Sequence, residues 1–156
     1  MWRHQHDASL AAFERAIALN ANFVDWPFGA ALIFAGESWR AIDVLEAYMR
    51  LDPFYVPMCS GMLGWAHYML KQYAQALPKL RDCVFRMPRF RSGHVFLAAT
   101  YAQLGLLEEA RAEAAEILRI TPEWTIGIST RLVGFKYPVD RDHYVDGLRK
   151  VGLPER

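Results

Sequence analysis

Three kinds of residue recur along this chain at one interval of 35 residues. The recurring pairs are Gly29 and Gly64, Ala41 and Ala76, and Pro53 and Pro88. A third proline, Pro122, follows Pro88 at a spacing of 34 residues. Several independent landmarks at one interval indicate a chain built from repeated structural units of about that length.

The clearest unit is the stretch 63–88, LGWAHYMLKQYAQALPKLRDCVFRMP. Gly64 and Ala76 are small enough to let two helices approach closely, and Leu80 has the bulk to fill the space between them. Pro88 cannot continue a helix, so it ends the unit. The stretch therefore predicts two antiparallel helices joined by a tight turn.

This unit resembles the tetratricopeptide repeat (TPR), whose consensus has Leu-Gly and an aromatic residue, then a small, a bulky and a small residue and a closing proline. The residues that carry the resemblance are Leu63, Gly64, His67, Ala76, Leu80, Cys83 and Pro88. His67 stands where the family has an aromatic residue, and Cys83 stands where it has alanine. The resemblance implies an all-α, right-handed solenoid of antiparallel helix pairs that acts in protein–protein interaction.

The chain reads as a single TPR array over residues 1–156. The expected units are a partial repeat at 1–21, repeats at 22–53, 54–88 and 89–122, and a capping segment at 123–156 with a C-terminal capping helix. Ser9, Phe13 and Ala16 match a second repeat helix, and there is no room before them for its first helix beyond a last turn at Trp2. We therefore expect a fragment of a longer protein, because a repeat unit cannot bury its apolar face alone.

Apolar spacing and turn residues place the individual helices. The expected ranges are 7–20, 24–35, 39–51, 57–70, 73–87, 91–104, 107–120, 124–133 and 140–151. Pro78 falls inside the fifth range, where its ring would clash with the carbonyl of Ala74. Either that helix starts late, with Pro78 in its first turns, or it bends there.

Charge and cysteine content exclude several kinds of site. The formal net charge is +1, which gives no general attraction to nucleic acid. Cys59 and Cys83 have neither CxxC nor zinc-ligand spacing, so we expect no metal, no cofactor and free thiols in the cytoplasm. No apolar run approaches the roughly 18 residues needed to span a membrane, so we expect no membrane insertion. Residues 1–7 are polar, unlike a signal peptide.

The TPR resemblance also implies where a partner would bind, because the first helix of each pair lines a concave groove. The inward positions are Trp26, Ile33, Phe34, Met58, Met62, Trp65, Tyr68, Met69, Val95, Phe96 and Gln103. Methionine and aromatic side chains can repack around varied partners. We expect Trp26, Met62, Trp65, Tyr68 and Phe96 to be partly exposed. The alternative is that these side chains pack against missing N-terminal repeats or against the capping helix.

From that groove we expect the partner to be a protein or peptide. Another domain of the same chain could also be the partner. The Lys, Asn and Arg residues with which chaperone-binding TPRs clamp a carboxylate terminus do not occur at these positions. That partner class is therefore excluded.

A second resemblance covers the tail, DRDHYVDGLRKVGLP, residues 140–154. It is similar to the end of TPR modules that follow class III adenylate/guanylate cyclase domains in some alpha-proteobacteria. The resemblance implies the C-terminal regulatory region of a bacterial signalling protein. The paired metal-binding aspartates of a cyclase are not found here, so we expect no catalysis by this chain.

The remaining reactive side chains have plain structural interpretations. The histidines are His4, His6, His67, His94 and His143. His67 is expected to be a hydrogen-bonded histidine between helices, and Cys83 a small buried residue rather than a nucleophile. The basic cluster Arg86, Arg89 and Arg91 is expected to be a solvated loop.

Three functions remain. The first is a protein-interaction module, the second is a scaffold for homo-oligomerisation (a homodimer in its simplest form), and the third is an enzyme. A pocket with convergent polar groups and perturbed titrating residues would favour the enzyme.

Overall fold

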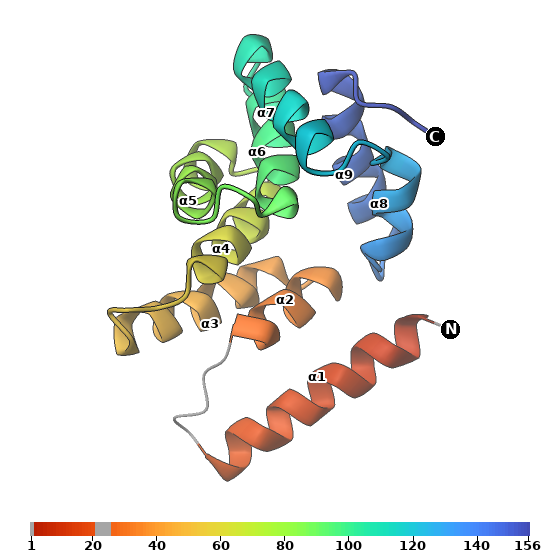
Figure 1. Ribbon diagram of the computed structural model, residues 1–156. Coiled ribbons are helices and arrows are strands. Elements are labelled where there is room, and N and C mark those ends of the chain that lie inside the picture. Colours follow the sequence, from red (N-terminus) through yellow and green to blue (C-terminus); the bar gives the residue numbers. More distant parts are fainter. Residues whose placement is uncertain (1, 21–25) are drawn as a thin grey trace.

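The computed structural model describes residues 2–20 and 26–156, and in these ranges all regular structure is α-helical (Figure 1). The helices are α1 (Trp2–Leu19), α2 (Trp26–Phe34), α3 (Ser38–Leu51), α4 (Pro57–Met69), α5 (Tyr73–Arg86), α6 (Arg91–Gln103), α7 (Leu107–Ile120), α8 (Ile126–Leu132) and α9 (Pro138–Val151). Helices α2 and α3, α4 and α5, and α6 and α7 form antiparallel pairs, and each pair packs on the next. The predicted all-α class is confirmed.

The first helix differs from the prediction at its start. It begins at Trp2 rather than near residue 7, and Trp2 shares one continuous helix with Phe13. A separate first helix whose last turn holds Trp2 is therefore not seen, because residues 3–12 contain no glycine or proline to interrupt α1. The predicted start of the next helix, at residue 24, lies outside the described residues.

Pro78 lies inside α5 without ending it. The helix begins at Tyr73, so Pro78 occupies its second turn. A proline at this depth removes one backbone hydrogen bond to Ala74. Packing of the apolar face of α5, which includes the fully buried Ala76 and Leu80, holds the helix together.

The turn inside each helix pair has one repeated geometry. Gly36, Lys71 and Gly105 all have positive φ, at 85°, 59° and 77°. Each donates its N–H to a carbonyl three residues back, and the following residue donates to a carbonyl five residues back, as in a Schellman motif. Glycine adopts this conformation freely, whereas Lys71 holds it at a steric cost.

Close approach within a pair depends on the glycine of the first helix. A Cβ atom at Gly29 would lie 2.7 Å from Leu45, and one at Gly64 would lie 2.5 Å from Leu80. The fourth repeat holds Ala98 and Ala114 at the corresponding positions. A larger residue on the first helix is therefore matched by a smaller one on the second, which conserves volume at the contact.

This compensation is testable by a double-mutant cycle. Gly64→Ala should lower the free energy of unfolding by about 1–3 kcal/mol through overpacking. Leu80→Ala should cost about 2–5 kcal/mol through the cavity it leaves. The double variant, which reproduces the fourth repeat, should be clearly more stable than the sum of the two changes implies, as measured by urea denaturation. Gly64→Ala with Leu45→Ala, from different pairs, is the additive control. Additivity in the Gly64–Leu80 pair would refute the account.

The C-terminal part closes on itself. Thr125 caps α8 by accepting the Ile128 N–H at 3.1 Å. The carbonyl of Pro154 accepts the Ile126 N–H at 2.8 Å, so the end of the chain folds back onto the start of α8. Gly152, with φ of 84°, ends α9 and makes this return possible. In the described part of the chain, no helix combines the length and apolarity that a membrane crossing requires.

Candidate protein-binding face

The side chains predicted to line a groove do lie on the first helices α2, α4 and α6. Most of them are buried: Ile33, Met62, Trp65, Tyr68, Met69, Val95 and Phe96. Trp26, Phe34, Met58 and Gln103 are partly exposed. The predicted partial exposure of Met62, Trp65, Tyr68 and Phe96 is therefore wrong, since Trp65 is 5% and Tyr68 0% exposed.

The cover on this face is the C-terminal segment of the same chain. Helix α9 packs mainly on α6 and also reaches α4 and α7, as the blue helix beside α6 in Figure 1 shows. The segment that joins α8 to α9, residues 133–137, continues the cover toward α2. The alternative in which the inward side chains pack against the capping helix therefore describes this structure.

His143 joins α9 to the third repeat. Its ring stacks on Tyr68, with centroids 4.7 Å apart and planes 3° from parallel. Burial, together with the nearby Lys71 charge, lowers the pKa of the His143 imidazole, so the ring is neutral. Its Nε2 shares a hydrogen bond with the Tyr73 hydroxyl at 2.9 Å. The Tyr68 hydroxyl donates to the His143 carbonyl at 3.3 Å.

Tyr144 is the principal anchor on the fourth repeat. Its ring lies 5.1 Å from that of Phe96, and its hydroxyl is 2.5 Å from the Ser129 hydroxyl of α8. At the edge of the contact, the Gln103 amide donates to Asp146 at 3.2 Å and accepts from Lys150 at 2.8 Å. An apolar centre and a polar rim make α9 resemble a ligand in an interface.

The joining segment reaches the second repeat. Phe135 meets Phe34 edge-on at 5.9 Å, and the Lys136 N–H donates to the Phe34 carbonyl at 2.9 Å. The Lys136 ammonium also pairs with Asp7 of α1 at 2.7 Å. One continuous segment thus contacts α1, α2, α4 and α6.

Several of these residues were missed by the sequence reasoning. The apolar stripe of Tyr144, Val145, Leu148 and Val151 was visible, but the surface it would meet was not. Gly147 carried a usable signal, because glycine inside a helix is unfavourable unless something approaches closely.

Gly147 is a point of close contact between α9 and side chains of α4 and α6. A Cβ there would collide with the Tyr68 hydroxyl oxygen and would lie 3.0 Å from the Ala99 Cβ.

The other candidate residues do not converge. His67 is partly exposed and bonds to Gln72 at 2.7 Å, so it is hydrogen-bonded but not fully in the core. Burial raises the pKa of the Cys83 thiol to about 11, which keeps it protonated at neutral pH. Both cysteines are free thiols. The side chain of His4 lies outside the described residues, and no group of three or more potential metal ligands occurs among the described ones.

The arginines around Pro88 point to separate structural partners. Arg86 donates to the Tyr55 carbonyl at 2.9 Å and lies over the Tyr55 ring. Arg91 donates to the Thr121 hydroxyl at 3.2 Å. These contacts fix loops between repeats rather than form an anion site.

His94 is buried between α6 and α7 with an acceptor at each ring nitrogen. Nδ1 is 2.5 Å from a Glu113 carboxylate oxygen, and Nε2 is 2.9 Å from the Pro88 carbonyl. Both nitrogens can donate only in the imidazolium. The hydrogen bond to Glu113 raises the pKa of the His94 side chain accordingly.

Because the pKa of His94 is raised in the folded state, its contribution to stability should change with pH in a defined direction. The contribution of His94 should be fully present below the unfolded pKa, about 6.5, and should be lost as the pH rises through the folded value. A charged hydrogen bond of this kind is worth about 1–3 kcal/mol. In urea titrations from pH 6 to 9, His94→Gln should remove that part of the pH dependence. Identical pH profiles for the two proteins would contradict the assignment.

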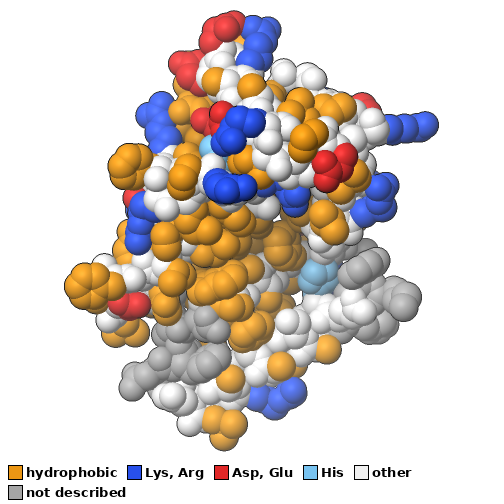
Figure 2. Space-filling model, viewed as in Figure 1, with side chains coloured by type: hydrophobic (Ala, Val, Ile, Leu, Met, Phe, Trp, Pro, Cys, Tyr) orange, Lys and Arg blue, Asp and Glu red, His pale blue; other side chains and the backbone are white. Residues whose placement is uncertain are grey.

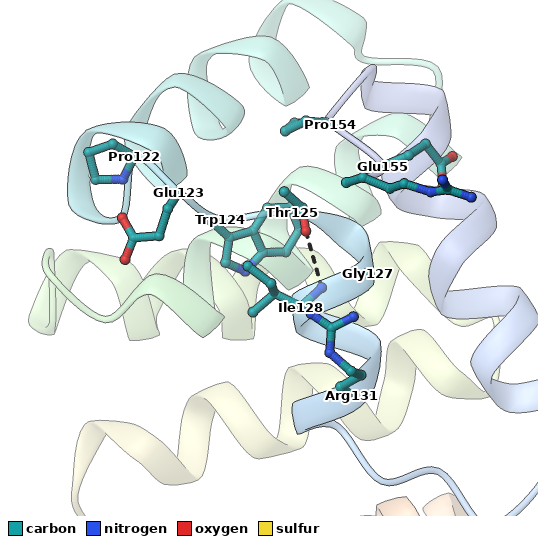
Figure 3. A pocket seen from close by; sticks show the side chains of 10 residues that line it. Pro122, Glu123, Trp124, Thr125, Gly127, Ile128, Arg131, Pro154 and Glu155 are labelled. Atoms are coloured by element: carbon teal, nitrogen blue, oxygen red, sulfur yellow. Dashed lines mark hydrogen bonds between the residues drawn. The ribbon is translucent and has the colours of Figure 1, made fainter.

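A pocket of about 590 Å³ lies at the C-terminal end, between the loop 122–125, α8 and the returning tail (Figure 3). Trp124, Ile128 and Pro154 form apolar walls, and Arg131 extends from α8 at its edge. Glu155 in its wall pairs with Arg149 at 2.6 Å, which lowers the pKa of that exposed carboxyl. The titrating group that is perturbed here belongs to a surface ion pair, so the pocket does not favour the enzyme hypothesis.

Apolar surface also remains open on the concave side. Figure 2 shows hydrophobic side chains gathered across the middle of one face, between α1 and the C-terminal helices. The partly exposed Trp26, Phe34 and Met58 belong to the predicted groove.

Comparison with solved structures identifies the fold. MamA matches with a TM-score of 0.67 and 19% identity over 94% of this chain and 86% of that one. YrrB, described as a TPR protein with an unusual peptide-binding site, matches with a TM-score of 0.64 and 21% identity over 95% and 77%. TTC0263, a thermophilic TPR protein of Thermus thermophilus, matches with a TM-score of 0.66 and 22% identity over 95% and 82%. The chain has a TPR-like fold.

No protein-family model matches the sequence, and no curated protein matches it significantly.

Proposed function

We propose that this chain is a protein-interaction module that binds a protein or peptide segment along the concave face of α2, α4 and α6. One observation carries the proposal: residues 133–151 of the chain itself lie along that face and contact every repeat. A surface that accepts one amphipathic helix and its linker has the shape and chemistry to accept another.

The anchors on this face are aromatic. Trp65 stacks on Phe96 at 4.1 Å, and Tyr68 meets Phe96 edge-on at 5.6 Å. A few large, rigid side chains of this kind dominate affinity in protein interfaces. The partner is a protein or peptide, and a domain of the same polypeptide is one form of it. YrrB offers a parallel, since it is described as having a peptide-binding site.

We also propose that the module is the C-terminal regulatory part of a bacterial adenylate/guanylate cyclase-like protein. The support is the tail resemblance, and several residues of that tail have structural tasks. Gly147 permits close approach, Leu148 and Leu153 are buried, Gly152 ends α9, and Pro154 caps α8. A cyclase domain in the upstream reading frame would support this assignment, and an unrelated upstream domain would overturn it.

Self-association is the second candidate function. Phe13 and Ile17 of α1 pack against the core yet remain partly exposed, although the Phe13 ring stacks on Phe28 at 5.2 Å. A second copy of the chain could cover them. Sedimentation at increasing concentration tests this: a dimer lost on Ile17→Glu favours the scaffold, and a monomer throughout excludes it.

The binding proposal is tested by selecting random 16-residue displayed peptides on the purified chain. We expect enriched peptides to shift the NMR methyl signals of Met58 and Met62, which lie on the concave side. The signals of Met49 and Met87, on α3 and after α5, should stay unchanged and serve as the control. Enriched peptides that shift only the control methyls, or a failure to enrich any peptide, would contradict the proposal.

A further inference from the structure

Helix α9 fits the concave face well, but its fit is incomplete. The indole Nε1 of Trp65 is buried and has no hydrogen-bond partner among the described residues. The same ring borders a cavity of about 40 Å³ whose wall includes Phe96, Leu132 and Tyr144. A buried donor that loses water without gaining an acceptor weakens the arrangement that buries it.

Beside the part-buried Tyr73–His143 hydrogen bond, the polar contacts of α9 with α4 and α6 are exposed or long. The Gln103–Asp146 and Gln103–Lys150 hydrogen bonds are exposed to solvent, and the Tyr68–His143 bond is long at 3.3 Å. Exposed contacts of this type contribute little to stability. The hold of α9 on the face therefore rests on Tyr144, Leu148, the His143 ring stacked on Tyr68 and the close approach at Gly147.

We propose that α9 is a displaceable intramolecular ligand that closes the concave face, and that the partner it competes with is an amphipathic helix of the same design. Such a helix presents an aromatic side chain toward Phe96, a glycine three residues later against Tyr68, and a bulky apolar residue next to it. This inference rests on the proposed function and adds the regulation of the same site.

The charged and titratable groups around α9 do not oppose its release from the concave face. Tyr68 and Tyr73 face α9 from α4 and α5, Lys71 faces it from the turn between them, and Asp146 and Lys150 pair with each other at 2.9 Å. No ion pair between α9 and α4 or α6 is found among the described residues, so opening breaks no salt bridge with those helices.

Gly147→Leu offers a direct test in the full chain. Any side chain at position 147 collides with Tyr68, so α9 should leave the face while the repeats stay folded. The matched control is Val139→Leu, which enlarges α9 where the side chain is 72% exposed. The probe is a labelled peptide of residues 138–156, titrated against each protein by fluorescence anisotropy.

We expect the peptide to bind Gly147→Leu at least about tenfold more tightly than it binds the wild type, because a site that is closed most of the time shows a proportionally weakened affinity. Val139→Leu should match the wild type, and a peptide that itself carries Gly147→Leu should not bind. Equal affinities for wild type and a folded Gly147→Leu protein would overturn the proposal.

If Gly147→Leu does not fold, hydrogen exchange on the wild-type chain tests whether α9 leaves the concave face by local opening. Amides of α9 should exchange faster than those of α4 and α6, through local opening. Equal protection in all three helices would mean that α9 leaves only on global unfolding, which overturns the proposal. Displayed peptides could shift the Met58 signal while the α9 amides stay protected from exchange. That result would support the binding function and overturn the proposal that α9 closes the face.

Discussion

A helix pair of this repeat has apolar surface on two sides, and water is excluded from both only when each side has a neighbour. Along the array the next pair supplies that neighbour. On the concave side the first helices present Trp65, Tyr68 and Phe96 together, and no further repeat can cover them. The position of α9 follows from this constraint, since burial of large aromatic side chains is among the strongest driving forces in a fold of this size.

The same constraint explains the unusual end of the chain. After Pro122 the repeat pattern stops, and α8 is a short helix that contacts α9 but does not extend the stack. Its role is to turn the chain back, so that α9 crosses the concave face of α6 and reaches α4. Tyr144 bridges both neighbours, with its ring against Phe96 and its hydroxyl on Ser129. The capping helix α9 therefore lies on the first helices α6 and α4 rather than beyond the last helix pair.

The sequence predicted the helices well, because glycine, alanine and proline at a constant interval mark where helices meet and stop. Most predicted boundaries lie within two residues of those observed. The TPR resemblance also implied a set of inward positions, and these residues lie on the first helices α2, α4 and α6. The sequence did not predict their burial, because periodicity tells which side of a helix is apolar and not which element covers it. The pairing of Tyr68 with His143, 75 residues away, has no local signature; Gly147 was the nearest clue.

The burial of the inward aromatic side chains depends on α9 lying against the first helices of its own chain. The most direct measurement is the set of NMR cross-relaxation signals between ring protons of α9 and those of α4 and α6. We expect strong signals between His143 and Tyr68 and between Tyr144 and Phe96, whose ring centroids are 4.7 Å and 5.1 Å apart. Absence of both signals in the monomeric protein, with α9 amides unprotected from exchange, would contradict this position of α9.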